Sequence, residues 1–399
     1  MKRSLERGGL IPAAAFLVAV LCSLAASVQV AQSAGVRGAG AERADSVDAP
    51  PELSAAAWYL VGEHGEVLAA RRAREGRAIA SITKLMTAIV TLEKARLSET
   101  VTVAARSARV GESTASLRTG EQLPVSTLLR ALLVASANDA ADALAMHVGK
   151  GSADRFVELM NRKARDLGLE QTRFVNPHGL DEAGHVSSAE DATTLVRYAL
   201  GIPFIRDALD RTSVELPGGR ELPTTDDLLE DWPPLLGGKT GHTADAGWSQ
   251  AAAARARGVT VYGTVLGGPS RTARNVALEE LLSYGLGRYR RVAAIDGSRV
   301  YAEAETGYDQ PAVRLVARRT TAVTVLGGNS LVERIVAPSV VELPVRRGQR
   351  LGRVEVYDGK RLVASSRLVA AEAVSEPDWL GKASWYAQQT AANLWAIFP

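Results

Sequence analysis

Alternating apolar and polar positions mark both ends of the first long region of the chain. Residues 56–71 contain two strand-like runs around a polar turn, which predicts a hairpin, and a β-branched run follows at 258–268. Apolar residues recur at helical spacing in four further segments, at residues 81–94, 125–150, 153–167 and 273–284. We therefore expect an α/β domain over residues 53–290, whose N- and C-terminal strands share one sheet.

The pattern changes after residue 290. Short alternating segments separated by glycine turns follow one another at residues 312–326, 340–357 and 360–370. This spacing is typical of antiparallel sheets and predicts a small all-β domain over residues 291–373.

The last segment, residues 374–399, is rich in aromatic residues and helical in its spacing. Trp and Tyr favour the membrane–water interface, while polar residues interrupt the apolar run, so we expect an amphipathic helix that lies on a membrane surface without crossing it. A helix packed on the β domain is the alternative. The apolar face consists of Trp379, Leu380, Ala383, Tyr386, Ala387, Ala391, Leu394, Trp395 and Phe398.

The N-terminus has the features of an export signal. Three basic residues precede a long uncharged stretch, and small residues follow it, which predicts a signal peptide over residues 1–34. The alternative is an uncleaved membrane anchor, because the uncharged stretch is nearly long enough to span a bilayer. Residues 35–52 have the composition of a linker. In either case we expect the protein in the periplasm or at the outer face of the cytoplasmic membrane, in peripheral association with it.

Composition and charge exclude several classes of function. The net charge of +3 comes from scattered residues and is too small to indicate a nucleic-acid partner. The single cysteine, Cys22, lies in the predicted signal, so the mature protein has no disulfide and no thiolate nucleophile. The five histidines lack metal-ligand spacing, and we expect neither a metal nor another cofactor.

Ser81 and Lys84 stand at the head of the apolar helical segment 81–94. Residues three apart share a helix face, and a helix that begins at Ser81 would favour negative charge developing there. Because burial lowers the pKa of a lysine, a neutral Lys84 amine could take the serine proton. An N-cap serine and a solvated lysine are the alternative interpretation.

Two further polar groups favour the catalytic interpretation. Ser136-Ala137-Asn138 interrupts a long apolar helical stretch, and polar groups there need partners. Lys239-Thr240-Gly241 precedes a strand-like region and would offer an extended peptide a cation, a hydroxyl and unobstructed backbone. S-x-x-K, S-x-N and K-T-G in this order are the motifs of penicillin-binding proteins and serine β-lactamases.

With these motifs, the chain resembles the low-molecular-mass penicillin-binding proteins that are D-alanyl-D-alanine carboxypeptidases. Sequence blocks in family order extend the resemblance over about residues 52–290. The resemblance implies the penicillin-binding, β-lactamase-like transpeptidase fold, followed by the all-β domain and the terminal helix. Ala137 stands where the family usually has glycine, which narrows the cleft and removes no functional group.

The resemblance also implies roles for the motif residues. Ser81 would be the nucleophile that attacks the penultimate D-alanine of a peptidoglycan stem peptide, Lys84 its base, and Ser136 the proton relay. The backbone N–H groups of Ser81 and His242 would form the oxyanion hole. β-Lactam antibiotics would act as covalent inhibitors. The substrate-binding residues would be Asn138, Lys239, Thr240, Gly241 and Arg274.

Three other functions remain open at this point. A β-lactamase shares the motifs, but the class A enzymes need a deacylating glutamate in an E-x-x-L-N setting, and Glu158 and Asn161 do not have that spacing. A DD-endopeptidase would cut crosslinks with the same groups. A non-catalytic peptidoglycan-binding homologue would keep the fold without a competent Ser81.

Overall fold

The computed structural model describes residues 49–397, and side chains up to residue 392. The predicted signal peptide and most of the predicted linker lie outside the described residues. The described chain folds as two compact units: one extends to Val292 and includes Thr324–Asn329, and the other comprises Ala293–Val323 and the chain from Ser330 onward. Within residues 49–397, no helix is both long and apolar enough to cross a membrane.

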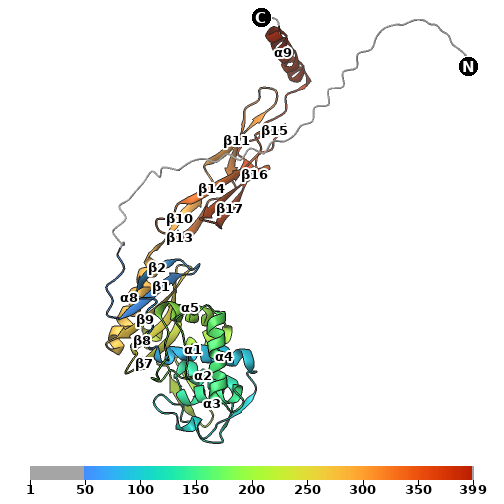
Figure 1. The fold of residues 1–399 in the computed structure, drawn as a ribbon. Helices are drawn as coiled ribbons and strands as arrows, with labels where there is room; N and C mark the ends of the chain where they lie inside the picture. The colour runs from blue at the N-terminus through green and yellow to red at the C-terminus, as the bar shows by residue number, and fades with distance from the viewer. Residues whose placement is uncertain (1–48, 398–399) are drawn as a thin grey trace, which may run out of the picture. The chain divides into compact units, whose positions relative to one another are not determined.

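The first unit is built on a five-stranded antiparallel sheet in the order β2-β1-β9-β8-β7. Its first two strands form the predicted hairpin, and β1 pairs with β9, so strands from both ends of the unit share one sheet as the sequence indicates (Figure 1). The strands are β1 (Ala57–Gly62), β2 (Val67–Arg71), β7 (Leu235–Thr243), β8 (Gly247–Ala256) and β9 (Val259–Gly268).

Helices pack on both faces of this sheet. Ala251 and Ala253 of β8 face a large core shared with helices α1 to α6, and Ala252 and Ala254 face the second core, which helix α8 completes. A strand that is buried on both faces has apolar residues at consecutive positions. This explains the alanine-rich sequence of β8, which follows the K-T-G motif. The α-helices are α1 (Lys84–Lys94), α2 (Val125–Val134), α3 (Asn138–Val148), α4 (Ala153–Asp166), α5 (Ala189–Leu200), α6 (Pro203–Leu209), α7 (Leu228–Asp231) and α8 (Arg271–Gly287).

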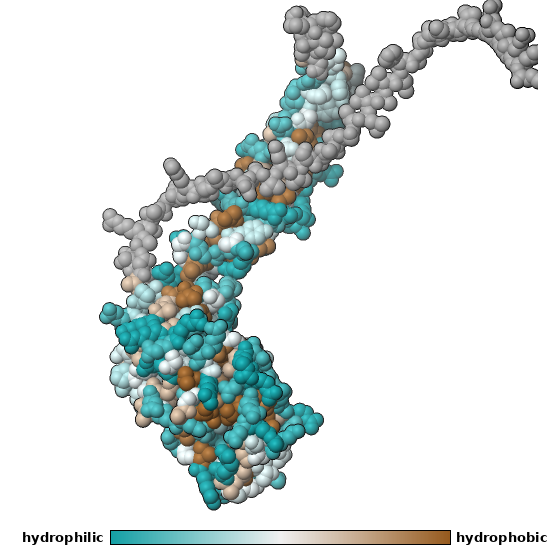
Figure 2. Space-filling model, in the orientation of Figure 1, coloured by the Kyte–Doolittle hydropathy of each residue, from teal (hydrophilic) through white to brown (hydrophobic). Residues whose placement is uncertain are grey.

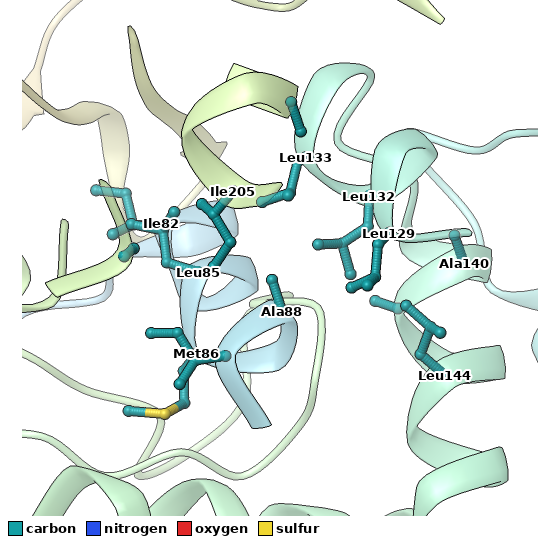
Figure 3. Close-up of a cluster of buried hydrophobic side chains, with 14 of the residues drawn as sticks. Ile82, Leu85, Met86, Ala88, Leu129, Leu132, Leu133, Ala140, Leu144 and Ile205 are labelled. Atoms are coloured by element: carbon teal, nitrogen blue, oxygen red, sulfur yellow. The ribbon is translucent and has the colours of Figure 1, made fainter. Parts of the chain in front are cut away.

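Helix α1 lies at the centre of the larger core. Leu85, Met86 and Ala88 are fully buried, and Figure 3 shows Ala88 on the side of α1 that faces the leucines of α2 and α3, with Leu85 beside Ile205. The predicted helical segment 81–94 begins as a 3₁₀ turn, Ala80–Thr83, and becomes α-helical at Lys84.

The predicted helical segment 125–150 is two helices. The chain breaks between α2 and α3 because Ser136 adopts a left-handed backbone conformation, with φ of 60°. The break turns the S-x-N residues toward α1. The remaining elements of the unit are two short two-stranded sheets and a second 3₁₀ turn, namely β3 (Thr100–Thr102) with β4 (Gln122–Pro124), β5 (Ser213–Leu216) with β6 (Arg220–Pro223), and Ser107–Arg109.

The second unit contains a six-stranded sheet in the order β14-β16-β17-β12-β11-β15. Its alternating residues build a separate apolar core around Leu315, Val354 and Leu368, as the strand pattern predicts. Ala293–Ile295 and Thr321–Val323 of this unit belong to strands β10 (Tyr289–Ile295) and β13 (Thr321–Leu326), which pair as a separate two-stranded sheet. The sheet strands are β11 (Val300–Thr306), β12 (Val313–Ala317), β14 (Leu331–Val336), β15 (Val340–Val341), β16 (Arg350–Asp358) and β17 (Arg361–Ala370).

Helix α9 (Trp379–Ile397) forms where the aromatic periodicity predicts a helix. The Trp385 ring packs edge-on against Tyr308, in the β11–β12 loop, with ring centroids 5.3 Å apart. Trp379 and Leu380 are nevertheless 74% and 56% exposed. The helix therefore contacts Tyr308 of the β domain through Trp385, Tyr386 and Lys382, while Trp379 and Leu380 face solvent.

Asp139 fixes the loop between β3 and β4 to the start of α3. Its carboxylate, 1% exposed, accepts backbone N–H bonds from Ala115, Leu117 and Ala140 at 2.8–3.1 Å. The carboxylate therefore has the structural role that its position after Asn138 suggests.

We expect Asp139→Ala to lower the free energy of unfolding by about 1–3 kcal/mol, because buried N–H donors lose their acceptor. Urea denaturation measures the change. The exposed Asp166→Ala, at the end of α4, is the control and should change stability by less than about 0.5 kcal/mol. Equal stability of the two variants would contradict the assignment.

Candidate active site

Ser81 and Lys84 meet at the junction of the 3₁₀ turn and α1. Lys84 is fully buried, and its Nζ lies 2.6 Å from Ser81 Oγ, 2.6 Å from Asn138 Oδ1 and 2.9 Å from the His178 carbonyl oxygen. The two carbonyl oxygens can only accept hydrogen bonds. A neutral amine would therefore donate its two N–H groups to them and direct its lone pair at the Ser81 hydroxyl.

The surroundings of Lys84 favour that neutral amine. Burial lowers the pKa of Lys84 well below the ordinary value of 10.5, and the positive charge of Lys239 lowers it further, against the opposing effects of Glu112 and Asp139. Lys84 is therefore neutral at a much lower pH than a solvated lysine, as a general base must be.

Ser136 and Asn138 reach the site from the turn between α2 and α3. Ser136 lines the same cleft as Ser81. The Asn138 amide nitrogen donates to the Gly111 carbonyl at 2.9 Å, which fixes the amide so that its oxygen faces Lys84. One amide N–H of Asn138 is thus already used within the protein.

Strand β7 forms the other wall of the cleft, at the edge of the sheet. A Cβ on Gly241 would lie 2.8 Å from the Ile79 carbonyl oxygen and 3.0 Å from the Ser81 nitrogen, so only glycine allows β7 to approach this closely. The glycine of K-T-G therefore sets the spacing between the β7 backbone and the Ser81 N–H. The next residue, His242, packs its ring on Trp248 at 4.1 Å.

Two buried basic residues, Lys239 and Arg274, lie at this side of the cleft. Lys239 is 1% exposed, and its burial lowers its pKa to about 7, with Arg274 adding to the decrease and Asp226 opposing it. Arg274, on α8, is 2% exposed and lines the cleft, so it is not a solvated helix arginine. Its guanidinium binds Asn275 and lies 3.6 Å from the carboxylate of Asp227. Together these cations suit the cleft to an anionic group.

Thr240 faces the cleft from the same strand, and its hydroxyl lies 2.7 Å from that of Thr225. The cleft has a volume of about 580 Å³. The structure thus brings all nine predicted site residues into one region: seven line the cleft, while Lys84 and Lys239 lie buried beside it.

Other cleft residues were not predicted from the sequence, because no motif marks them. Among the residues that line the described cleft, Glu112 is the acidic one. Asp226 is a buried carboxylate whose charge acts on Lys239, and it accepts a hydrogen bond from the Gln250 side-chain amide at 2.7 Å. Further lining residues missed by the sequence analysis include Leu180, Thr225, Trp248 and Arg271.

His178 and His185 shape the loop before α5. The His185 ring lies 2.8 Å from the Thr83 hydroxyl and accepts from the Val175 N–H, while burial lowers its pKa to about 4. His178 contributes its carbonyl oxygen to Lys84. Among residues 49–397, no cluster of side chains suited to a metal ion is found.

Comparison with known proteins identifies the family. The family model described as D-alanyl-D-alanine carboxypeptidase matches residues 44–270. This chain belongs to the D-alanyl-D-alanine carboxypeptidase family. Among curated relatives, DacD of Salmonella typhimurium is 30% identical over 86% of this chain and 92% of its own length, and DacF of Bacillus subtilis is 29% identical over 77% and 82%.

Solved structures agree with this assignment to the D-alanyl-D-alanine carboxypeptidases. Penicillin-binding protein 5 from Haemophilus influenzae matches with a TM-score of 0.61 at 27% identity, over 82% of this chain and 99% of that one. The Streptomyces K15 DD-transpeptidase matches with a TM-score of 0.57 at 29% identity, over 60% of this chain and 99% of that one. The chain therefore has the penicillin-binding fold and is a serine peptidase of this family.

The depressed pKa of Lys239 predicts a pH dependence. Lys239 is cationic below its pKa of about 7, so attraction of a carboxylate is lost as the pH rises through that value. The second-order rate constant for acylation by benzylpenicillin should therefore fall above about pH 7. In Lys239→Arg, whose side chain stays charged, this decrease should move to higher pH. An unchanged alkaline limb in the arginine variant would contradict the assignment.

Proposed function

We propose that this chain, as a DD-carboxypeptidase, uses Ser81 as nucleophile and Lys84 as base to remove the terminal D-alanine of peptidoglycan stem peptides. The observation that supports this most strongly is the position of the buried Lys84 amine, 2.6 Å from the Ser81 hydroxyl. The Asn138 and His178 oxygens accept both N–H groups of a neutral amine, so its lone pair points toward the Ser81 hydroxyl.

In the first half of the reaction, the Ser81 proton moves to Lys84 Nζ while Ser81 Oγ attacks the carbonyl carbon of the penultimate D-alanine. The oxygen of that carbonyl becomes negative, and the backbone N–H groups of Ser81 and His242 stabilise it. Each donor of such a hole contributes about 3–4 kcal/mol. The C–N bond then breaks: Ser136 gives its hydroxyl proton to the amine of the departing D-alanine and takes the proton held by Lys84 in return, so that an acyl-enzyme with a neutral Lys84 remains.

In the second half, water attacks the ester carbonyl and gives its proton to Lys84. The ester bond breaks, Ser81 regains its proton, and the shortened peptide leaves. Recognition of the substrate rests on the opposite wall: Thr240 and Arg274 bind the terminal carboxylate, and Lys239 adds positive potential. The remaining N–H of Asn138 holds the substrate amide.

The position of Glu158 argues against a β-lactamase, which would need a glutamate as deacylating base in the cleft. Glu158 is exposed on α4 and does not line the cleft, and the Asn161 side chain is occupied by the backbone of Val157 and Phe174. A penicillin acyl-enzyme without a deacylating carboxylate should persist. Penicillin is then an inhibitor of this enzyme rather than its substrate.

Ser81→Ala should abolish both penicillin labelling and D-alanine release from a diacyl-Lys-D-Ala-D-Ala peptide, with turnover reduced by more than about a thousandfold, because no other group forms the acyl-enzyme. Intact-mass spectrometry and a D-alanine assay measure the two effects. The exposed Ser98→Ala serves as the control and should retain both activities. Labelling that persists in Ser81→Ala would rule out the nucleophile assignment, and rapid loss of the wild-type adduct would favour a β-lactamase.

Attachment to the membrane surface through α9 is a second part of the proposal. Trp379, Leu380 and Tyr386 are exposed, and aromatic rings favour the interface. Lys382 is paired with Glu376, so attraction to anionic lipid contributes little and the apolar side chains carry the binding.

A protein that begins at residue 35 should sediment with phosphatidylcholine vesicles, and Leu380→Glu should weaken this by about tenfold, because a charge replaces an exposed apolar side chain. The exposed Leu362→Glu, in the β domain, is the control and should bind vesicles like the wild type. Equal vesicle binding by all three proteins would exclude α9 as the anchor.

A further inference from the structure

A basic pocket in the second unit is distinct from the active site. It has a volume of about 580 Å³ and is lined by Arg318, Arg319, Ser365, Ser366 and Arg367. The pocket forms where β12 ends, because β12 pairs with β17 only from Leu368 to Ala370 and leaves the preceding part of β17 uncovered by that strand. Three arginines and two serines therefore line one hollow. Hydrophilic residues cover much of the β domain in the view of Figure 2.

These three arginines are not neutralised within the protein. In the part of the chain that the structure describes, none of Arg318, Arg319 and Arg367 forms an ion pair, although arginines elsewhere in this domain do so, among them Arg299, Arg314 and Arg353. The backbone N–H of Arg318 donates to the Arg367 carbonyl oxygen at 3.2 Å. This bond fixes the two arginines side by side across the end of the strand.

The sheet places an ion pair, Arg353 with Glu355, beside the pocket. Arg353 of β16 lies directly opposite Arg367, and like charges in that arrangement are destabilising. The nearby carboxylate of Glu355 is already engaged, since Arg353 and the Tyr357 hydroxyl donate to its two oxygens at 2.8 Å and 3.0 Å. Glu355 thus compensates Arg353, and the charges of Arg318, Arg319 and Arg367 remain as an excess that an external anion would relieve.

The donor set indicates the chemistry of that anion. Guanidinium groups bind phosphate and carboxylate oxygens in pairs. The Ser365 hydroxyl can donate to a remaining oxygen, whereas the Ser366 hydroxyl already donates to the Arg367 carbonyl at 3.4 Å. Three guanidinium groups offer more donors than the two oxygens of one carboxylate can accept well, which favours phosphate. The hollow falls in the range of about 300–1,000 Å³ that holds a whole organic ligand, which favours a phosphate group within a larger molecule.

We propose that this pocket binds the phosphate groups of an anionic cell-envelope polymer, such as a polyol phosphate, and so holds the enzyme near its substrate. A lipid headgroup would provide the same phosphate. The pocket, however, adjoins the end of β12 opposite to the Tyr308 loop on which α9 packs, about 16 Å away along the strand. A membrane bound by α9 would therefore not meet the pocket directly.

The test compares the full protein with a triple variant, Arg318→Gln, Arg319→Gln and Arg367→Gln. A charge-matched control replaces Arg346, Arg347 and Arg350, which are exposed in the same domain outside the pocket, by glutamine. The probe is fluorescent poly(glycerol phosphate), with binding followed by anisotropy at several salt concentrations. Thermal unfolding and D-alanine release from a soluble peptide are measured for each protein, and both should be unchanged.

The triple variant should bind the polymer at least about tenfold more weakly and with a smaller dependence on salt, whereas the control should lose less than about threefold. Equal losses in the two variants would overturn the proposal in favour of general positive charge. Equally tight binding of inorganic phosphate would mean a site for the free ion. Binding to phosphatidylglycerol vesicles that requires the three arginines, without binding to the polymer, would mean a headgroup site. Absence of polymer binding by the wild type, with D-alanine release intact, would refute this inference alone.

Discussion

The burial of one amine, Lys84 Nζ, governs the arrangement of the first unit. A lysine removed from water destabilises a protein unless its nitrogen finds partners. Here the partners come from three separate parts of the chain, namely the turn before α1, the start of α3 and the loop that contains His178. Each of these parts must be held in place for the amine to remain buried, and the same arrangement keeps it neutral and beside Ser81.

Strained backbone at two positions accompanies this arrangement. Ala80 and Ser136, neither of them glycine, adopt φ of 46° and 60° on either side of the amine. Such conformations cost of order 1–3 kcal/mol and persist only where the surrounding structure imposes them. Gly179 contributes to that constraint, since a Cβ at this position would lie 2.0 Å from the Ala80 carbonyl oxygen. Asp139 contributes from α3 by binding the loop between β3 and β4.

The sequence predicted most of the fold because its elements have clear local patterns. The hairpin before α1, strand β9, helices α4 and α8 and the β-rich second unit follow from periodicity alone. The motifs also predicted which residues gather around Ser81. What the sequence did not reveal depends on contacts between distant segments. The break between α2 and α3 results from the left-handed backbone conformation of Ser136, and the spacing of apolar residues does not predict that conformation.

The electrostatic environment was also beyond local patterns. Arg274 is buried only because α8 packs its first turn against Trp248 and Asp227. Asp226, in the segment before α7, raises the pKa of Lys239 on β7, and the basic pocket of the second unit arises where β12 ends. These features depend on the register of paired strands, which a single sequence does not give.

The ionisation of Lys84 is the most direct test of this account. Titration of the protein labelled at lysine Nζ with ¹⁵N, followed by NMR, gives the pKa of each lysine, and Lys84→Arg identifies the resonance. Burial and the charge of Lys239 predict that Lys84 titrates well below the ordinary value of 10.5. A pKa near 10.5 would mean that the amine is protonated at neutral pH, and Lys84 could not then be the base that activates Ser81.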